Sequence, residues 1–199
     1  MRPRFLPSHE IEASALHLLK QHYSKYPIPV PIEEIIEVKL KIRIIPTPGL
    51  RPDYGIDALA LHDFSQINID DWQFNYNENR TRFSLAHELG HFVLHKHYVD
   101  SLTFNSKEEW IEFILNDLHR EPLETQANMF ASYLLLPTDD LKIEVERVKS
   151  DLANLEEFKE IKMPDDFVLA PYLAKGISKK FAVSVETATY RLQNFFKNH

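Results

Sequence analysis

Residues 82–91 read Arg-Phe-Ser-Leu-Ala-His-Glu-Leu-Gly-His, and they decide how the rest of the chain is interpreted. We expect a helix over residues 80–97, which includes this stretch. His87 and His91 are four residues apart, so on a helix they share one face and lie about 6 Å apart along the axis. Two imidazoles at that spacing can reach one zinc ion at about 2.1 Å. The stretch therefore predicts a helix that holds part of a metal site.

Glu88 stands between the two histidines and completes the order His-Glu-x-x-His. In this pattern the histidines bind zinc, and the glutamate acts as general base toward the water that attacks a carbonyl. We therefore expect Glu88 to be the catalytic base of a hydrolase. The alternative is a surface helix with scattered histidines, because a match of five residues can arise by chance.

Zinc needs a third protein ligand, and two histidines nearby are the first alternatives. His95 lies eight residues after His87, about 12 Å along a continuous helix, whereas two ligands of one zinc lie within about 4 Å of each other. His97 has the offset of a longer zinc-binding pattern, but Leu94 stands where that pattern has a glycine. We instead expect His95 and His97 to be polar, cationic side chains near a helix C-terminus.

A better third ligand lies in residues 123–131. Glu124, Ala127 and Ala131 share one helix face, and its small residues would let the helix approach another backbone closely. An acid on such a contact face is costly unless it is paired or bound to a metal. Asn128, one turn after Glu124, is placed to hydrogen-bond a ligand imidazole. We favour Glu124 over three rival acids that lack such a face. The rivals are Glu112, Asp117 and Glu121.

The remaining hydrophobic patterns predict an α+β fold. Three short strands are expected near the N-terminus, and they form a small, mostly antiparallel three-stranded sheet because the connections are short. The sheet packs on helices that include the His-Glu-x-x-His helix, and the C-terminal half is all helical. The expected strands are 40–44, 56–62 and 66–70. The other expected helices are 8–23, 31–38, 106–119, 122–136, 138–160 and two or three between 167 and 196.

Composition excludes several classes of protein. The chain has 199 residues, 23 Lys and Arg against 30 Asp and Glu, and no cysteine. The absence of cysteine excludes disulfides, a cysteine nucleophile and thiolate zinc sites. The net charge of −7 is a poor match to extensive nucleic-acid binding. No apolar run suffices to span a bilayer, and no signal peptide is recognised, so we expect a cytoplasmic protein with no membrane partner.

Two blocks of sequence, taken in order, resemble a known family. Residues 82–91 with His95, followed by residues 124–137, look like the ImmA/IrrE family of zinc metalloendopeptidases. The likeness extends to residues 29–36 and 181–192. It covers most of the chain, and the two central blocks together are highly specific.

The resemblance implies a gluzincin-like architecture with one zinc ion. His87, His91 and Glu124 would be the zinc ligands and Glu88 the catalytic base. Family members act mostly as regulatory proteases or antirepressors on helix-turn-helix repressors, so the implied partner is a basic repressor of that kind. Gln126 departs from the family pattern, because an acid is common at its position.

Catalysis of this kind needs a further donor for the oxyanion of the tetrahedral intermediate. The candidates are Tyr98, Tyr54 and Tyr133, and the sequence does not choose among them. An extended peptide substrate could add to an edge strand, for which residues 56–62 are the candidate. The alternative is that these strands are only scaffold.

Two other functions stay open. In one, the protein binds a repressor through a zinc-containing domain without cleaving it. In the other, residues 171–199 form a helix-turn-helix that binds DNA. We expect those helices to pack on a single domain that spans residues 1–199, so DNA binding is not favoured. Residues 107–160 carry 14 acids against 6 basic residues, a charge that suits a basic partner or a solvated helix face.

Overall fold

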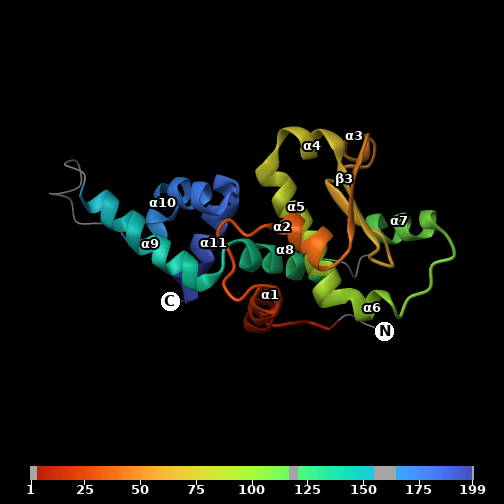
Figure 1. Cartoon of the computed structure of the whole chain (residues 1–199), viewed down its shortest axis with the longest axis horizontal. Helices are drawn as coiled ribbons and strands as arrows, with labels where there is room; N and C mark the ends of the chain where they lie inside the picture. The colour runs from red at the N-terminus through yellow and green to blue at the C-terminus, as the bar shows by residue number, and fades with distance from the viewer. Residues whose placement is uncertain (1–3, 117–120, 155–164, 199) are drawn as a thin grey trace. The chain divides into compact units, whose positions relative to one another are not determined.

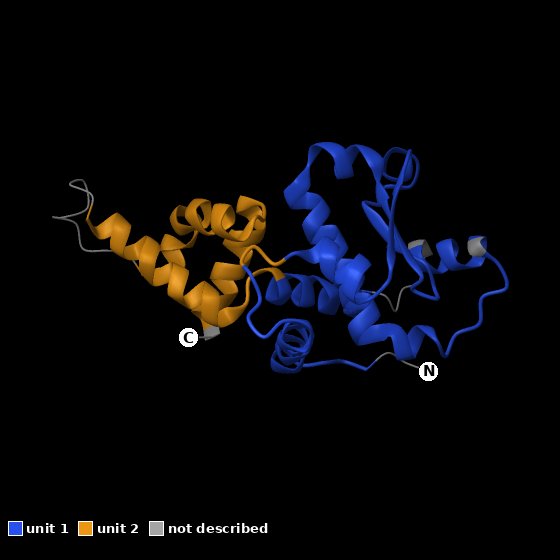
Figure 2. Cartoon of the chain, viewed as in Figure 1, with its two compact units in different colours: residues 1–27, 31–134 blue, residues 28–30, 135–199 orange. Residues whose placement is uncertain are grey.

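Two compact units make up the chain (Figure 2). Unit 1 comprises Met1–Pro27 and Pro31–Leu134, and unit 2 comprises Ile28–Val30 and Leu135–His199. The structure, a computed structural model, describes residues 4–116, 121–154 and 165–198. Within these residues no helix is both long enough and apolar enough to cross a membrane. The single domain expected over residues 1–199 stays a prediction, because the division into units does not test whether each folds alone.

Along the chain, unit 1 has helices before its small sheet and more helices after it, with α3 between the first two strands (Figure 1). In chain order its elements are α1 (Ser8–His22), α2 (Ile32–Glu34), the π-helix η1 (Ile35–Lys39), β1 (Arg43–Thr47), α3 (Leu50–Tyr54), β2 (Ala58–Ala60), β3 (Gln66–Asp70), α4 (Asp71–Tyr76), α5 (Glu78–Gly90), the π-helix η2 (His91–His95), α6 (Lys96–Val99), α7 (Lys107–Asn116) and α8 (Glu121–Leu135). The sequence did not predict the two short helices α3 and α4.

The sheet is mixed rather than mostly antiparallel, which corrects the prediction. Its order is β1-β3-β2, with β3 parallel to β1 and antiparallel to β2. The prediction assumed that consecutive strands pair. Instead β3 inserts between the other two, and the longer passage from β1 through α3 and β2 lets the chain return in the parallel direction. As a result, β2 lies at an edge of the sheet.

The first strand lies three residues later than predicted. The alternation over residues 40–44 favours a strand there, but η1 continues to Lys39 and Lys41 has a φ of +60°, a left-handed conformation that breaks extended backbone. The strand therefore starts at Arg43 and includes Pro46. Proline is tolerated because β1 is also an edge strand. The third strand has the predicted bounds.

Helix α5 occupies the centre of unit 1 and carries His87 and Glu88, while His91, the last residue of the His-Glu-x-x-His sequence, begins η2. It begins after Asn77, whose side chain accepts a hydrogen bond from the Arg80 amide at 3.3 Å. The apolar side chains of Leu85 and Leu89 are fully buried, and α5 packs against β2 and β3. The predicted helix over 80–97 is present, but its C-terminal part is the π-turn η2 followed by α6.

The regular structure in the described residues of unit 2 is helical, as predicted for the C-terminal half. It contains α9 (Thr138–Ala153), α10 (Asp166–Phe181) and α11 (Val185–Asn198). The predicted helix over 138–160 extends into residues 155–164, which lie outside the described residues. Between α10 and α11 the chain turns at Ala182, whose φ is +51°, and Ser184 caps α11 by accepting a hydrogen bond from the Thr187 amide. A helix–turn–helix arrangement is therefore present, while its role stays untested.

Candidate metal centre

The three side chains proposed as metal ligands, those of His87, His91 and Glu124, lie close together. Nε2 of His87 lies 3.1 Å from Oε2 of Glu124, and Nε2 of His91 lies 3.2 Å from Oε1 of the same carboxylate. The two Nε2 atoms are 3.1 Å apart. Donors about 2.1 Å from one tetrahedral ion lie roughly 3.4 Å from one another, so this spacing suits a single small cation. Among the described residues, this is the one group of three or more such side chains that could hold a metal.

Helix α8 can bring Glu124 to the histidines because it approaches α5 very closely. A methyl group added at Gly90 would lie 3.1 Å from Cα and 3.2 Å from the carbonyl oxygen of Ala127. Contacts that short require both residues to be small. Glu124 lies one turn before Ala127, so the same approach sets its distance from His87 and His91. Of the rival acids, Glu112 and Glu121 are exposed, and Asp117 lies outside the described residues.

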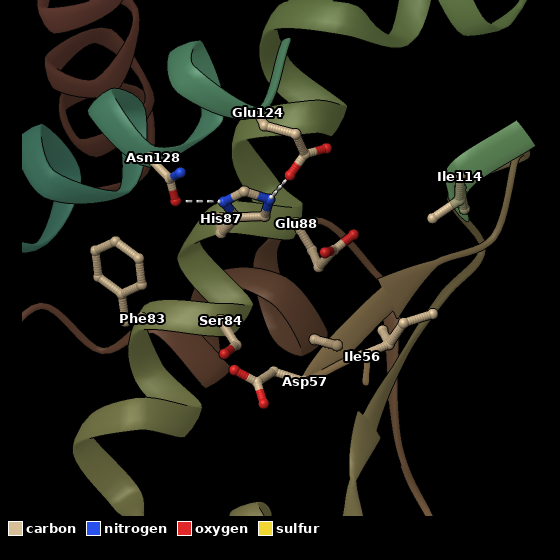
Figure 3. A pocket seen from close by; sticks show the side chains of 10 residues that line it. Ile56, Asp57, Phe83, Ser84, His87, Glu88, Ile114, Glu124 and Asn128 are labelled. Atoms are coloured by element: carbon tan, nitrogen blue, oxygen red, sulfur yellow. Dashed lines mark hydrogen bonds and ion pairs between the residues drawn. The ribbon is translucent and has the colours of Figure 1, made fainter. Parts of the chain in front are cut away.

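The second ring nitrogen of His87 also has a partner on α8. Nδ1 of His87 lies 2.9 Å from Oδ1 of Asn128 (Figure 3). An amide oxygen can only accept, so Nδ1 carries a ring proton, and Nε2 is the ring nitrogen that can bind a metal. The structure thus places Asn128 beside a proposed ligand, in the arrangement that orients metal-binding imidazoles.

Glu88 points away from the three donors and toward the sheet. Its Oε2 accepts a hydrogen bond of 2.8 Å from the backbone amide of Ala60, in edge strand β2. The carbonyl oxygen of Ala60 accepts a 3.0 Å hydrogen bond from the Trp110 indole N–H. Glu88 is 6% exposed and borders the same pocket as His87 and Glu124. It is therefore close to the donors without being one of them.

The charges in the cluster are mutually dependent. Burial alone would raise the pKa of Glu124, but hydrogen bonds from His87 and His91 outweigh it and hold that pKa far below its usual value. Burial would likewise lower the pKa of His87, but its hydrogen bond with Glu124 and the charge of Glu88 raise it. Glu124 is therefore a carboxylate over the whole physiological range, and His87 binds a proton more readily than a free histidine.

The structure contradicts the expectation of a cationic His95 on a polar helix end. His95 is 3% exposed. Burial, reinforced by the nearby His91, lowers its pKa to about 4, so it is neutral at physiological pH. Nδ1 of His95 lies 3.1 Å from Nδ1 of His91. His97 is exposed on α6 and lines a separate pocket with residues of α1. Neither residue belongs to the described three-residue cluster.

An open pocket of about 480 Å³ gives access to the cluster (Figure 3). His87, Glu88 and Glu124 border it. Its other described lining residues, which the sequence did not single out, are Ile56, Asp57, Ala58, Phe83, Ser84 and Ile114, in addition to Asn128. Side chains alternate between the two faces of a strand, so residues of β2 can be assigned to the pocket only when the pairing of β2 is known. The sequence signal for β2 is weak.

None of the three tyrosines considered as oxyanion donors is among the described residues that line this pocket or the smaller one beside it. Tyr54 is exposed on α3, and Tyr98 lies on α6. The Tyr133 hydroxyl shares a hydrogen bond with the Ser8 hydroxyl at the start of α1.

Comparison with known proteins identifies the family. A model described as the IrrE N-terminal-like domain, a peptidase family, matches residues 62–193. The chain belongs to this family. The match covers α5, α8, α10 and the first part of α11, and it confirms the resemblance drawn from the two sequence blocks. No curated protein matches the sequence.

A solved structure named as a Mycobacterium tuberculosis transcriptional regulator is similar in fold. The TM-score is 0.57 at 15% sequence identity, and the match covers 92% of this chain and 46% of that one. This chain therefore spans about half the length of that regulator. At such low identity the likeness concerns the fold alone.

Proposed function

We propose that the protein is a zinc metallopeptidase in which His87, His91 and Glu124 bind the metal and Glu88 is the general base. The observation that carries the proposal is the convergence of three donor atoms within 4.8 Å, beside a fourth, acidic side chain in the same pocket. Membership of a peptidase family supports it. Two imidazoles and one carboxylate are a ligand set that suits catalytic zinc, with a coordination position left for substrate.

Zinc, when bound, would supply Lewis-acid chemistry: it lowers the pKa of water and stabilises negative charge on a carbonyl oxygen. The protein supplies the proton transfers. Oε2 of Glu88 is held by the Ala60 amide, which leaves Oε1 to accept a proton from water and to return it to the leaving nitrogen. The proposed base is thus oriented by the edge strand.

The same strand is the proposed site for an extended peptide. The carbonyl of Asp57 and the amide of Leu61 pair toward β3, so the polar groups of Ala58 and Ala60 point the other way. Ala58 borders the pocket beside Glu88. The amide and the carbonyl of Ala60 are already bonded to Glu88 and Trp110, so a peptide would pair with Ala58 and pass directly by the cluster.

The proposed role is regulatory cleavage of a basic helix-turn-helix repressor. Family membership and the name of the structural neighbour, a transcriptional regulator, support a regulatory role. The excess of acidic residues over 107–160 suits a basic partner. The cytoplasmic location expected from the sequence stays a prediction, as does the absence of DNA binding.

The test separates cleavage from mere binding. Zinc-loaded wild type and Glu88→Gln are incubated with a library of unstructured peptides, and the products are identified by mass spectrometry. The proposal predicts new termini with the wild type only, while both proteins retain zinc. Equal cleavage by both would remove Glu88 from the reaction. Zinc binding without any cleavage by the wild type would favour a non-cleaving regulator.

A further inference from the structure

The two proposed histidine ligands differ in how their second ring nitrogen is satisfied. For His87 the partner is an amide oxygen, which accepts a hydrogen bond from Nδ1–H. For His91 the partner is another imidazole, with the two Nδ1 atoms 3.1 Å apart. One of these two nitrogens must donate and the other accept. Nε2 of His91 can offer its lone pair to a metal only when Nδ1 of His91 is the donor.

The surroundings of His95 decide between the two arrangements. Nε2 of His95 and Oε1 of Gln126 are both buried and lack a hydrogen-bond partner in the described structure. The two side chains are neighbours that interact. Nε2 of Gln126 is directed to the Arg4 carbonyl at 3.4 Å, which orients the amide so that Oε1 is the atom left over. The two atoms do not form a hydrogen bond, but an amide oxygen only accepts, so its interaction with His95 is favourable when Nε2 of His95 carries the proton.

The local backbone brings the two imidazoles together. Residues four apart on a helix share one face, so His95 lies one turn beyond His91. Residues 91–95 form the π-turn η2, and the ring centroids of His91 and His95 are 5.2 Å apart. Such turns often mark functional positions within helices.

We infer that His95, backed by Gln126, is a positioning residue of the metal centre: its Nδ1 accepts a hydrogen bond from Nδ1–H of His91 and thereby directs the lone pair of His91 Nε2 toward the metal. This inference rests on the proposed metal site. In this arrangement α8 supplies one ligand, Glu124, and the acceptors that set the tautomer of both others, Asn128 directly and Gln126 through His95.

The test compares zinc affinity and tautomer in four proteins. His95→Leu removes the acceptor, whereas His95→Gln keeps an amide oxygen that can accept. His97→Leu, at an exposed histidine two residues away, is the matched control. Zinc affinity is measured by chelator competition on samples whose circular dichroism matches the wild type. We expect a loss of about 10- to 100-fold for His95→Leu, substantial recovery in His95→Gln and no change in His97→Leu.

The tautomer is read without metal, by nitrogen-15 chemical shifts of the imidazoles. The proposal requires the His95 ring to carry its proton on Nε2 and to leave Nδ1 unprotonated in the metal-free wild type. A His95 ring that carries its proton on Nδ1, or wild-type affinity in folded His95→Leu, would overturn it. If His95→Leu does not fold, Gln126→Leu tests the same chain of contacts and should weaken zinc binding several-fold. Failure of the wild type to bind zinc would instead refute the proposed function, while the tautomer still decides the inference.

Discussion

The close approach of α8 to α5 can be tested by a substitution at Gly90. A methyl group at Gly90 would lie 3.1 Å from Cα of Ala127, whereas ordinary contacts begin at 3.4 Å. Helix α8 would therefore have to retreat by about 0.3 Å, more than the roughly 0.2 Å tolerance of metal–ligand distances. Glu124 lies one turn away on the same helix and would retreat with it. We expect Gly90→Ala to weaken zinc binding by about tenfold.

The effect on stability follows from two opposing contributions. Alanine in place of a helical glycine stabilises by about 1 kcal/mol. Overpacking against backbone costs about 1–3 kcal/mol, since backbone cannot rotate away. Gly90→Ala should therefore lower the free energy of unfolding by about 1 kcal/mol, measured by urea denaturation of the metal-free protein.

Gly176 in α10 provides the matched control. A methyl group there would lie 3.2 Å from a Val148 side-chain methyl, which can move. Gly176→Ala should leave zinc affinity unchanged and the free energy of unfolding equal or higher by up to about 1 kcal/mol. If Gly90→Ala were as stable as Gly176→Ala and bound zinc as tightly as the wild type, the argument that close helix packing positions Glu124 would be wrong.

Three further results are expected. Zinc affinity should fall as the pH drops through the raised pKa of His87, because the ring must lose a proton before it binds zinc, whereas Glu124 stays ionised. The loss should be about tenfold per pH unit for each proton displaced. Chelator competition between pH 8 and pH 5.5 should show it beginning above 6.5, the ordinary pKa of histidine. Asn128→Ala should weaken zinc binding about tenfold, because the His87 tautomer is no longer held, and unchanged affinity would contradict that role. Trp110→Phe removes the donor to the Ala60 carbonyl and should cost about 1 kcal/mol in urea unfolding, a result that equal stability would refute.

The sequence predicts the candidate site better than it predicts the sheet. The spacing of His87 and His91 and the small residues around Glu124 are local signals, and each follows from the period of a helix. The pairing of β1 with β3 depends on contacts across many residues, which no local pattern reports. The shift of β1 likewise follows from the left-handed Lys41, a conformation that lysine rarely adopts.

The surroundings of His95 could not be predicted from its position in the sequence. Regular helical geometry correctly separates it from His87, but it does not reveal the π-turn or the burial of His95. Both arise from packing between elements distant in the sequence. The contact with His91 could be anticipated from their spacing of four residues, whereas the neutral state of His95 could not.

The metal content of the purified protein tests the proposed metal site most directly. Wild type, Glu124→Ala and Glu121→Ala are prepared without added zinc, and each is measured by inductively coupled plasma mass spectrometry. Glu121, exposed at the start of the same helix, serves as the control. We expect about one zinc per chain in wild type and Glu121→Ala, and a large loss in Glu124→Ala. Equal zinc in all three would exclude Glu124 as a ligand, and a wild type that takes up no zinc even when it is offered would contradict the metal centre itself.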